Sequence, residues 1–300
     1  MSFQVDTAFV DAFASNVIHL GQQKGSRLAG LLRRKDYRGE RVAFERIGAT
    51  SAVKRTSRHA DTPQIDTPHS RRWCVTETWD WADLIDEPDE VRLLIDPTNA
   101  YALAGAMAMG RAIDSVIIRA LDGVVYEGHK GTTTANFPSS QEVAVNAVEP
   151  GGAPANSNLT IEKLIRARSM LAKNEVIDQG PLVFVCTQSQ IDSLLRTTEI
   201  RSADYNAIRA LVAGEVNTYM GFQFVRTELL QTDSNGYRKC FAFVAGEMAG
   251  MGLAINIEPR VRISERPDKN YSTQVWISSD VGATRIEDEK VVRVLCDETA

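Results

Sequence analysis

The sequence predicts an α+β fold, and three patterns along the chain indicate it. A long alanine-rich helix is expected at 98–121, buried strands alternate with capped helices over 157–256, and long alternating runs at 255–265 and 271–295 close the chain. The 300 residues, 43% of them hydrophobic, are enough for one large or two modest domains with a substantial core.

The N-terminal segment is expected to begin with an amphipathic helix at 6–20, because its apolar residues recur at helical spacing. These residues are Phe9, Val10, Phe13, Val17 and Leu20, and Asp6 or Thr7 can cap the helix. The start of the chain has no apolar run typical of a signal peptide.

The next segment, 33–72, is too polar to fold by itself. Its large apolar side chains are Tyr37, Val42, Phe44, Ile47, Val53 and Ile65, set against eleven basic and five acidic residues. Such a segment buries too little apolar surface to offset its ordering entropy. Strand propensity at 42–44 and 53–55 nevertheless indicates a specific extended structure. We therefore expect another copy of the chain to supply the missing contacts.

Charge is strongly segregated between neighbouring segments. Residues 33–72 carry a net charge of about +6, whereas 77–96 carry about −7. Two alternatives follow: the two blocks pair within one subunit, or the basic segment crosses to the acidic block of an adjacent copy. The candidate inter-subunit contacts are Phe9, Phe13, Arg46, Lys54, Arg55, Arg58, Arg71, Arg72, Asp83, Asp86 and Glu87.

The second half of the chain shows recognisable helix and strand signals. Thr160 is expected to cap a helix, 181–186 reads as a buried strand, and 187–190 as a capping box opening a further helix. Ser202 is expected to cap another helix that ends at Gly214. A strand at 221–225, a turn at 233–236 and a return strand at 240–244 suggest a hairpin.

The sequence carries no pattern typical of a catalytic, cofactor-binding or metal-binding site. Its four cysteines and four histidines are scattered without metal-ligand spacing, and because the cysteines form no CxxC pair, a reducing cytoplasm is the expected environment. Cys186 follows a strand, but no histidine lies in the C-terminal half to activate it. The acidic run 287–289 is interpreted as a solvated turn, and the glycine-rich 246–252 as a turn with close backbone packing.

Two further features have structural interpretations. Trp73, Trp79 and Trp81 indicate a hydrophobic junction between the extended segment and the body, with a ligand cage as the alternative. The most apolar stretch, 100–121, contains Arg111, Asp114 and Arg119, so membrane insertion is not expected.

Several motifs give the chain a resemblance to a known family. They are Phe44–Thr50 with Lys54–Pro63, Trp81–Asp86 with Asp96-Pro97-Thr98, Ser202–Asn206, Met220-Gly221-Phe222, Glu265–Tyr271 and Gly282–Arg285. Over nearly the whole chain, they resemble the major capsid proteins of tailed bacteriophages, which share the Hong Kong 97-type fold.

The resemblance implies a division of the chain. Residues 1–35 would form an N-terminal arm and 36–78 an extended loop built as a β-hairpin. A peripheral domain would comprise 79–156 and 257–300, with the spine helix at 98–121, and an axial domain would comprise 157–256.

The resemblance also implies a function without a cofactor. The chain would be a non-enzymatic structural subunit that assembles in the host cytoplasm into the icosahedral capsid of a virion around double-stranded DNA. Its partners would be other copies in pentamers and hexamers, portal and scaffolding proteins, and packaged DNA on the inner face without sequence specificity. No membrane would be involved.

Other classes of function are less well supported. An encapsulin-like compartment would share the fold. A nucleic-acid-binding protein would use the basic segment on phosphates, but the net charge of −5 and the adjacent acidic block argue against it. An α/β enzyme would need converging polar groups at strand ends, and the sequence shows no such set.

Overall fold

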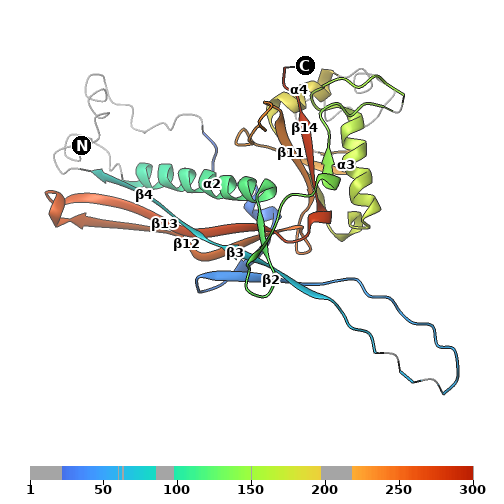
Figure 1. Cartoon of the computed structure of the whole chain (residues 1–300). Coiled ribbons are helices and arrows are strands. Elements are labelled where there is room, and N and C mark those ends of the chain that lie inside the picture. The colour runs from blue at the N-terminus through green and yellow to red at the C-terminus, as the bar shows by residue number, and fades with distance from the viewer. Residues whose placement is uncertain are drawn as a thin grey trace.

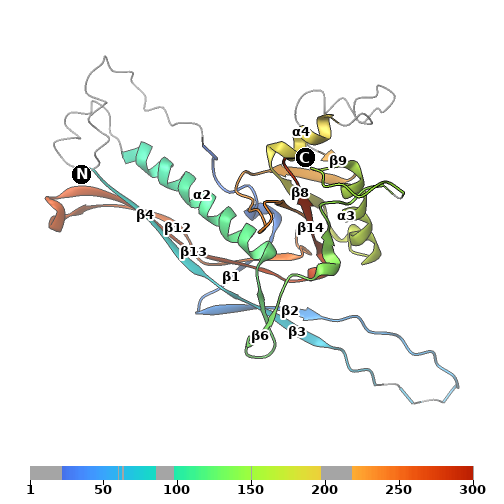
Figure 2. The ribbon, with the colours of Figure 1, turned by 45° about the horizontal axis from the view of Figure 1, so that its top comes forward.

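The chain forms an elongated molecule with three recognisable parts (Figures 1 and 2). The computed structural model describes residues 22–59, 61–62, 64–85, 98–149, 151–196 and 218–299. A long sheet with one helix along it lies at one end, an α/β unit lies at the other, and a hairpin projects away from both. The predicted helices at 6–20 and after Ser202 lie outside the described residues.

The long sheet has the strand order β1-β12-β13-β4. Its strands are β1 (Arg33–Asp36), β12 (Met251–Arg266), β13 (Ser272–Arg285) and β4 (Glu77–Ile85). β12 and β13 form a long antiparallel pair, whereas β1 runs parallel to the first residues of β12. The predicted long closing strands are therefore confirmed, although the second run ends at Arg285 before a separate last strand.

The predicted long helix is confirmed as α2 (Thr98–Asp122), which lies along the long sheet (Figure 2). Its small residues allow a close approach: a Cβ atom at Gly105 would come within 2.5 Å of the Trp81 ring and 2.6 Å of Ile277. Residues 100–122 are long and apolar enough to cross a membrane by composition. In this structure the same residues form a core helix that packs on β4 and β13 and contains the fully buried Asp114.

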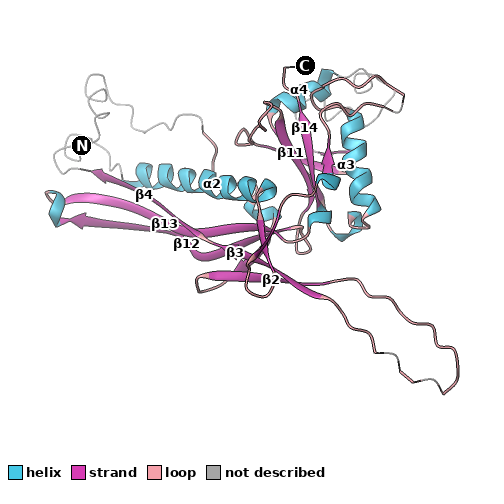
Figure 3. Cartoon of the chain, viewed as in Figure 1, coloured by secondary structure: helices cyan, strands magenta, loops and turns pink. Residues whose placement is uncertain are grey.

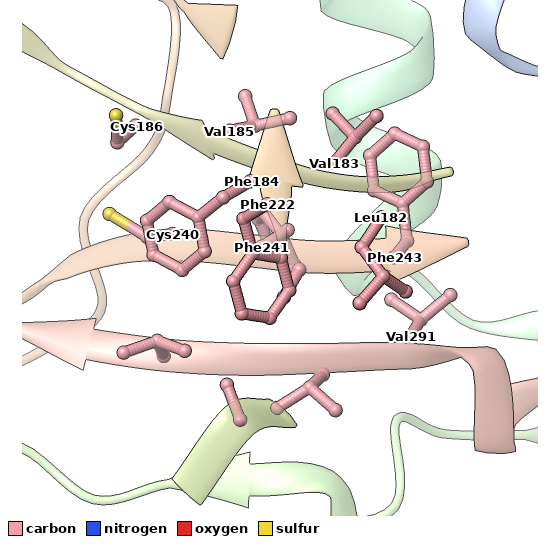
Figure 4. Close-up of a cluster of buried hydrophobic side chains, with 14 of the residues drawn as sticks. Leu182, Val183, Phe184, Val185, Cys186, Phe222, Cys240, Phe241, Phe243 and Val291 are labelled. Atoms are coloured by element: carbon pink, nitrogen blue, oxygen red, sulfur yellow. The ribbon is translucent and has the colours of Figure 1, made fainter. Parts of the chain in front are cut away.

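The α/β unit is built on a six-stranded sheet with the order β7-β14-β11-β8-β10-β9. The strands are β7 (Glu142–Val143), β14 (Val291–Cys296), β11 (Arg238–Val244), β8 (Leu182–Cys186), β10 (Phe222–Arg226) and β9 (Thr218–Tyr219). Every residue of β8 is buried, and Phe184, Phe222, Phe241 and Phe243 form the centre of the core (Figure 4). This continuous apolar run is what a central strand covered on both faces requires.

Two helices of the α/β unit begin at the residues that the sequence indicates. α3 (Ile161–Lys173) is capped by Thr160, whose side chain accepts a hydrogen bond from the backbone of Lys163. α4 (Gln188–Arg196) follows Thr187, whose backbone N–H donates to the side chain of Gln190 at 2.9 Å. The hydrogen bond from the Thr187 backbone to the Gln190 side chain is the one that defines a capping box.

Strand pairing corrects the expected hairpin. β10 and β11 do not form a hairpin, because β8 lies between them, parallel to β10 and antiparallel to β11. Residues 233–236 do form a tight turn, which is closed by the bridge between Thr232 and Arg238 and by backbone hydrogen bonds from Asp233 to Tyr237 and from Lys239 to Gln231. β7 and β14, which fall in the ranges expected for the peripheral domain, pair with each other and join the sheet of the α/β unit through β11.

A third sheet carries the projecting hairpin and has the order β2-β3-β5-β6. Its strands are β2 (Arg41–Ile47), β3 (His69–Val75), β5 (Val125–Glu127) and β6 (Thr133–Ala135). β5 and β6 therefore add short strands to the region 123–157 that the sequence presents as a loop. β2 and β3 are antiparallel, as expected for the extended segment.

Candidate assembly surface on the projecting hairpin

The root of the hairpin, meaning β2 and β3, has a small apolar core of its own. Val42, Phe44 and Cys74 pack with Ala254 of β12 and with Ile286. The Phe44 ring lies so close to Gly252 that a Cβ atom there would come within 2.6 Å of it. Burial raises the pKa of the Cys74 thiol to about 12, so this cysteine is a packing residue. At its root, the extended segment therefore has apolar contacts within its own chain, which its polar composition did not indicate.

Arg72 ties the root to two other parts of the chain. Its side chain is 3% exposed, and its guanidinium lies 2.6 Å from Glu127 of β5 and 2.6 Å from Asp288. The β3–β5 register places Arg72 opposite Glu127. Arg72 is therefore buried against partners of its own chain, and its expected contact with another subunit stays a prediction.

Arg285 extends the same charged cluster to the end of the long helix. It is fully buried, donates from Nε to Asp288 at 2.5 Å, and donates from Nη1 to the carbonyl oxygens of Leu121 and Gly123. A cation in this position complements the C-terminal end of the α2 dipole. Asp288 is thus a shared partner of two buried arginines, so the interpretation of 287–289 as a purely solvated turn is wrong at this residue.

Two other predicted arginines also have partners within the chain. Arg46 donates to the carbonyl oxygen of Ile286 at 2.9 Å and lies 3.4 Å from Glu127. Arg71 lies 3.1 Å from Glu45 across the β2–β3 pair. Neither acid belongs to the acidic block 77–96. The described structure therefore pairs the basic residues of the root with acids that the charge pattern does not single out.

The outer part of the hairpin, residues 48–68, differs sharply from the root. Every described residue from Ile47 to Ser70 is exposed, and the described residues between the two strands form a loop (Figure 3). The strand predicted at 53–55 is absent there. Val53 is 61% exposed and Ile65 is 43% exposed. Lys54, Arg55 and Arg58 are exposed in the same segment, which we call the tip.

Of the remaining predicted contact residues, the structure describes Asp83, which lies away from the hairpin. Asp83 lies on β4, where its carboxylate accepts a hydrogen bond from the backbone of Leu84. Phe9, Phe13, Asp86 and Glu87 lie outside the described residues. The tryptophans also have separate surroundings: Trp81 packs under α2, whereas Trp73 donates a hydrogen bond to the carbonyl oxygen of Gly128. Because Trp73 and Trp81 do not share one site, their placement favours a hydrophobic junction between the extended segment and the body over a ligand cage.

The candidate metal and nucleophile residues can be placed where the structure describes them. Among them, histidine, cysteine and carboxylate side chains form no cluster of three suited to a metal ion. Cys186 is fully buried, and burial raises the pKa of its thiol to about 12, which opposes thiolate chemistry. The turn at 246–252 packs closely, since a Cβ atom at Gly250 would lie 2.6 Å from Lys290.

Asp114 is a structural anchor that sequence reasoning missed. This fully buried carboxylate of α2 accepts hydrogen bonds from the Ser26 hydroxyl and from the backbone N–H groups of Arg27 and Leu28. Gln23 also donates to it. A buried charge is tolerated when several donors satisfy it. An aspartate in the middle of the most apolar stretch of the chain is the signal that could have revealed this anchor.

An elongated subunit with a rooted but uncovered hairpin has the architecture of an assembly protein. The sequence profile of the phage capsid protein family matches residues 5–298. The chain therefore belongs to the phage capsid protein family, and it is a structural subunit of a bacteriophage capsid. A search of curated protein sequences gave no significant match.

Solved structures with the same fold come from several phages. A structure from Mycobacterium phage Che8 has 18% identity and a TM-score of 0.67, covering 97% of this chain and 98% of that one. The capsid of Ralstonia phage GP4 has 10% identity and a TM-score of 0.71, with coverage of 96% and 94%. The capsid asymmetric unit of cyanophage Pam1 has 15% identity and a TM-score of 0.67, with coverage of 99% of both chains. These similarities confirm the expected Hong Kong 97-type fold.

Proposed function

We propose that this capsid subunit tiles an icosahedral shell around double-stranded DNA, and that its hairpin tip binds a neighbouring copy. The observation that carries the proposal is that every described residue of the tip, 48–68, is exposed. The other partners in the proposal are portal and scaffolding proteins and the packaged DNA, with assembly in the host cytoplasm. The expected division into peripheral and axial domains belongs to the same proposal.

The contrast between root and tip supports a contact with another subunit. The root has an apolar cluster and the Arg72 ion pairs to hold it, whereas Val53 and Ile65 of the tip remain exposed. Burying a Val or Ile side chain stabilises a complex by about 1.5 kcal/mol or more. A neighbouring subunit that covers the tip would gain this stabilisation without disturbing the root.

The charges of the hairpin favour this interface over general DNA binding by the hairpin. Arg46, Arg71 and Arg72 already have carboxylate partners within the chain. Lys54, Arg55 and Arg58 of the tip are exposed to solvent. Three exposed cations beside exposed apolar residues suit an acidic, partly apolar protein surface, where charge complementarity selects the partner.

The experiment neutralises the tip in the full-length protein. The triple variant Lys54→Gln, Arg55→Gln, Arg58→Gln is expected to keep the thermal stability of the subunit and to form fewer shells, as seen by negative-stain microscopy and sedimentation. The deficit should grow with added salt if the remaining tip contacts are partly electrostatic.

A matched control removes three exposed cations from the body of the chain with Lys24→Gln, Lys173→Gln and Arg196→Gln. It should assemble like the parent protein. Normal shells from the tip variant across the salt range, or an equal defect in the control, would contradict the proposed role of the tip.

A further inference from the structure

Two buried arginines at the base of the hairpin use only part of their guanidinium groups. Arg72 is 3% exposed and Arg285 is fully buried. Nε and Nη1 of Arg72 and Nη2 of Arg285 are buried and have no hydrogen-bond partner among the described residues. Buried polar groups of folded proteins are nearly always hydrogen-bonded, so these nitrogen atoms call for an explanation such as a bound ion or a bound water.

The unpartnered nitrogen atoms belong to one cluster, because both arginines bind the same carboxylate. Asp288 accepts a hydrogen bond from Arg72 through Oδ2 at 2.6 Å and from Arg285 through Oδ1 at 2.5 Å. Glu127 lies 2.6 Å from the same Nη2 atom of Arg72. Both carboxylate contacts of Arg72 therefore use one nitrogen atom, and the rest of its guanidinium has no acceptor in the described structure.

The ion pairs of this cluster contain more positive than negative charge. Arg46, Arg72 and Arg285 are the cations, whereas Glu127 and Asp288 are the only carboxylates that the described residues pair with them. Burying a charge is costly unless it is paired and hydrogen-bonded. Because an arginine can only donate hydrogen bonds, the group that would complete the cluster must accept them and should be negative.

The neighbouring ion pairs along the chain do not supply the missing negative charge. Arg71 pairs with Glu45 at 3.1 Å and Lys290 pairs with Glu287 at 2.8 Å, so each of these pairs is neutral. A bound water would accept hydrogen bonds from the arginines, but it would add two donors and no charge. The balance of donors and of charge therefore favours an anion.

We propose that a small inorganic anion of the chloride class binds between Arg72 and Arg285. It accepts hydrogen bonds from the unpartnered N–H groups of both guanidinium groups and balances their excess charge. Because Arg285 also donates to the carbonyl oxygens of Leu121 and Gly123, the anion ties the hairpin root to the C-terminal end of α2. This inference does not depend on the proposed contact of the hairpin tip with another subunit.

The first test uses selection of anions by size. Both arginines are buried, so a monatomic anion fits beside them and a large organic anion such as gluconate does not. The full-length, unassembled subunit is unfolded by heat in sodium chloride and in sodium gluconate at equal ionic strength. Chloride should raise the midpoint saturably, by about 5 °C at about a hundredfold excess over its dissociation constant. Equal midpoints in the two salts at every concentration would overturn the proposal.

A matched pair of variants locates the site. Arg72→Met removes one side of the anion site and should abolish the rise that is specific to chloride. Arg71→Met removes a partly exposed cation outside the cluster and should keep the full rise. Each variant is compared with itself in gluconate, so a difference in overall stability does not affect the result. A full rise in Arg72→Met, or its loss in Arg71→Met, would overturn the proposed site.

A crystallographic measurement does not depend on the folding of any variant. Bromide is a monatomic anion like chloride and gives a strong anomalous signal. Crystals of the parent subunit grown in bromide should show this signal within hydrogen-bond distance of both Arg72 and Arg285. A water molecule at that position, or no bound atom there, would contradict the proposal.

Discussion

Arg72 shows how one residue attaches the projecting hairpin to the rest of the subunit. It is almost fully buried, and its guanidinium joins β3 to Glu127 and Asp288. Asp288 in turn binds Arg285, which holds the C-terminal end of α2. Because removing one member of a buried ion pair leaves its partners uncompensated, this site should be sensitive to substitution.

We expect Arg72→Met to lower the free energy of unfolding of the subunit by about 3 kcal/mol. Arg71→Met is the matched control, because Arg71 makes a partly exposed pair with Glu45, and such pairs contribute about 0–1 kcal/mol. Urea unfolding of both variants measures the difference. Equal stabilities for the two variants would show that the buried cluster does not hold the root.

The surroundings of Asp122 predict how the free energy of unfolding changes at acidic pH. Burial alone would raise its pKa, but the ammonium of Lys239 at 2.6 Å and the guanidinium of Arg293 lower the pKa overall. A folded-state pKa below the unfolded value of about 3.9 means that the stabilisation is present above that pH and is lost as the pH falls through the folded value.

Asp122→Asn should therefore make the unfolding midpoint less dependent on pH between about pH 5 and pH 2 than it is in the parent. Urea midpoints across this range provide the measurement. If the urea midpoint of the variant changed with pH as steeply as that of the parent, other carboxylates would be responsible for the loss of stability in acid.

At the scale of single residues, the sequence identified the important arginines but not the carboxylates that pair with them. Arg46, Arg71 and Arg72 stand out in a basic segment, yet Glu127 and Asp288 lie far away along the chain. Local charge patterning points instead to the neighbouring acidic block. The pairing depends on strand register between β3 and β5, which composition does not encode.

At the scale of elements, α2 shows why small residues matter in a helix that lies on a sheet. Its predicted limits are close to the observed Thr98–Asp122, and Gly105 permits contact with both Trp81 and Ile277. A side chain at position 105 would force the helix and sheet apart, since both neighbours are large and buried or half-buried.

We expect Gly105→Val to lower the free energy of unfolding by about 2 kcal/mol through overpacking. Gly30→Ala is the control, because no atom lies within 4 Å of a Cβ built there. Chemical unfolding of the two variants is the measurement. A Gly105→Val subunit as stable as the parent would argue against tight packing between α2 and the long sheet.

Elements with strong local signals were predictable, whereas their pairing was not. Thr160 and the Thr187–Gln190 pair mark helix starts, and these contacts lie within a few residues. The order of the six-stranded sheet depends on long-range contacts, so β8 inserts between β10 and β11 despite the hairpin-like spacing of those two strands. The residues at 233–236 can form a tight turn whether or not the two flanking strands pair with each other.

The whole molecule has much more surface than a compact protein of its size. The chain exposes 18199 Å². A compact monomer of 33.1 kDa would expose about 12,600 Å² by the usual scaling of surface with mass. The fold class and family could be predicted from the order of long helix, α/β part and closing strands. The division of the hairpin into an anchored root and an exposed tip could not, because the root depends on residues from β5, β12 and the 286–288 turn.

The central claim is that the hairpin root is ordered within each subunit while the tip becomes ordered by contact with another copy. Hydrogen–deuterium exchange on unassembled subunits and on shells tests it directly, since amide protection reports local opening. We predict that amides of β2 and β3 are protected in both states, and that amides in 49–59 exchange rapidly in subunits and slowly in shells. Slow exchange of 49–59 in the isolated subunit, or equally rapid exchange after assembly, would contradict the account.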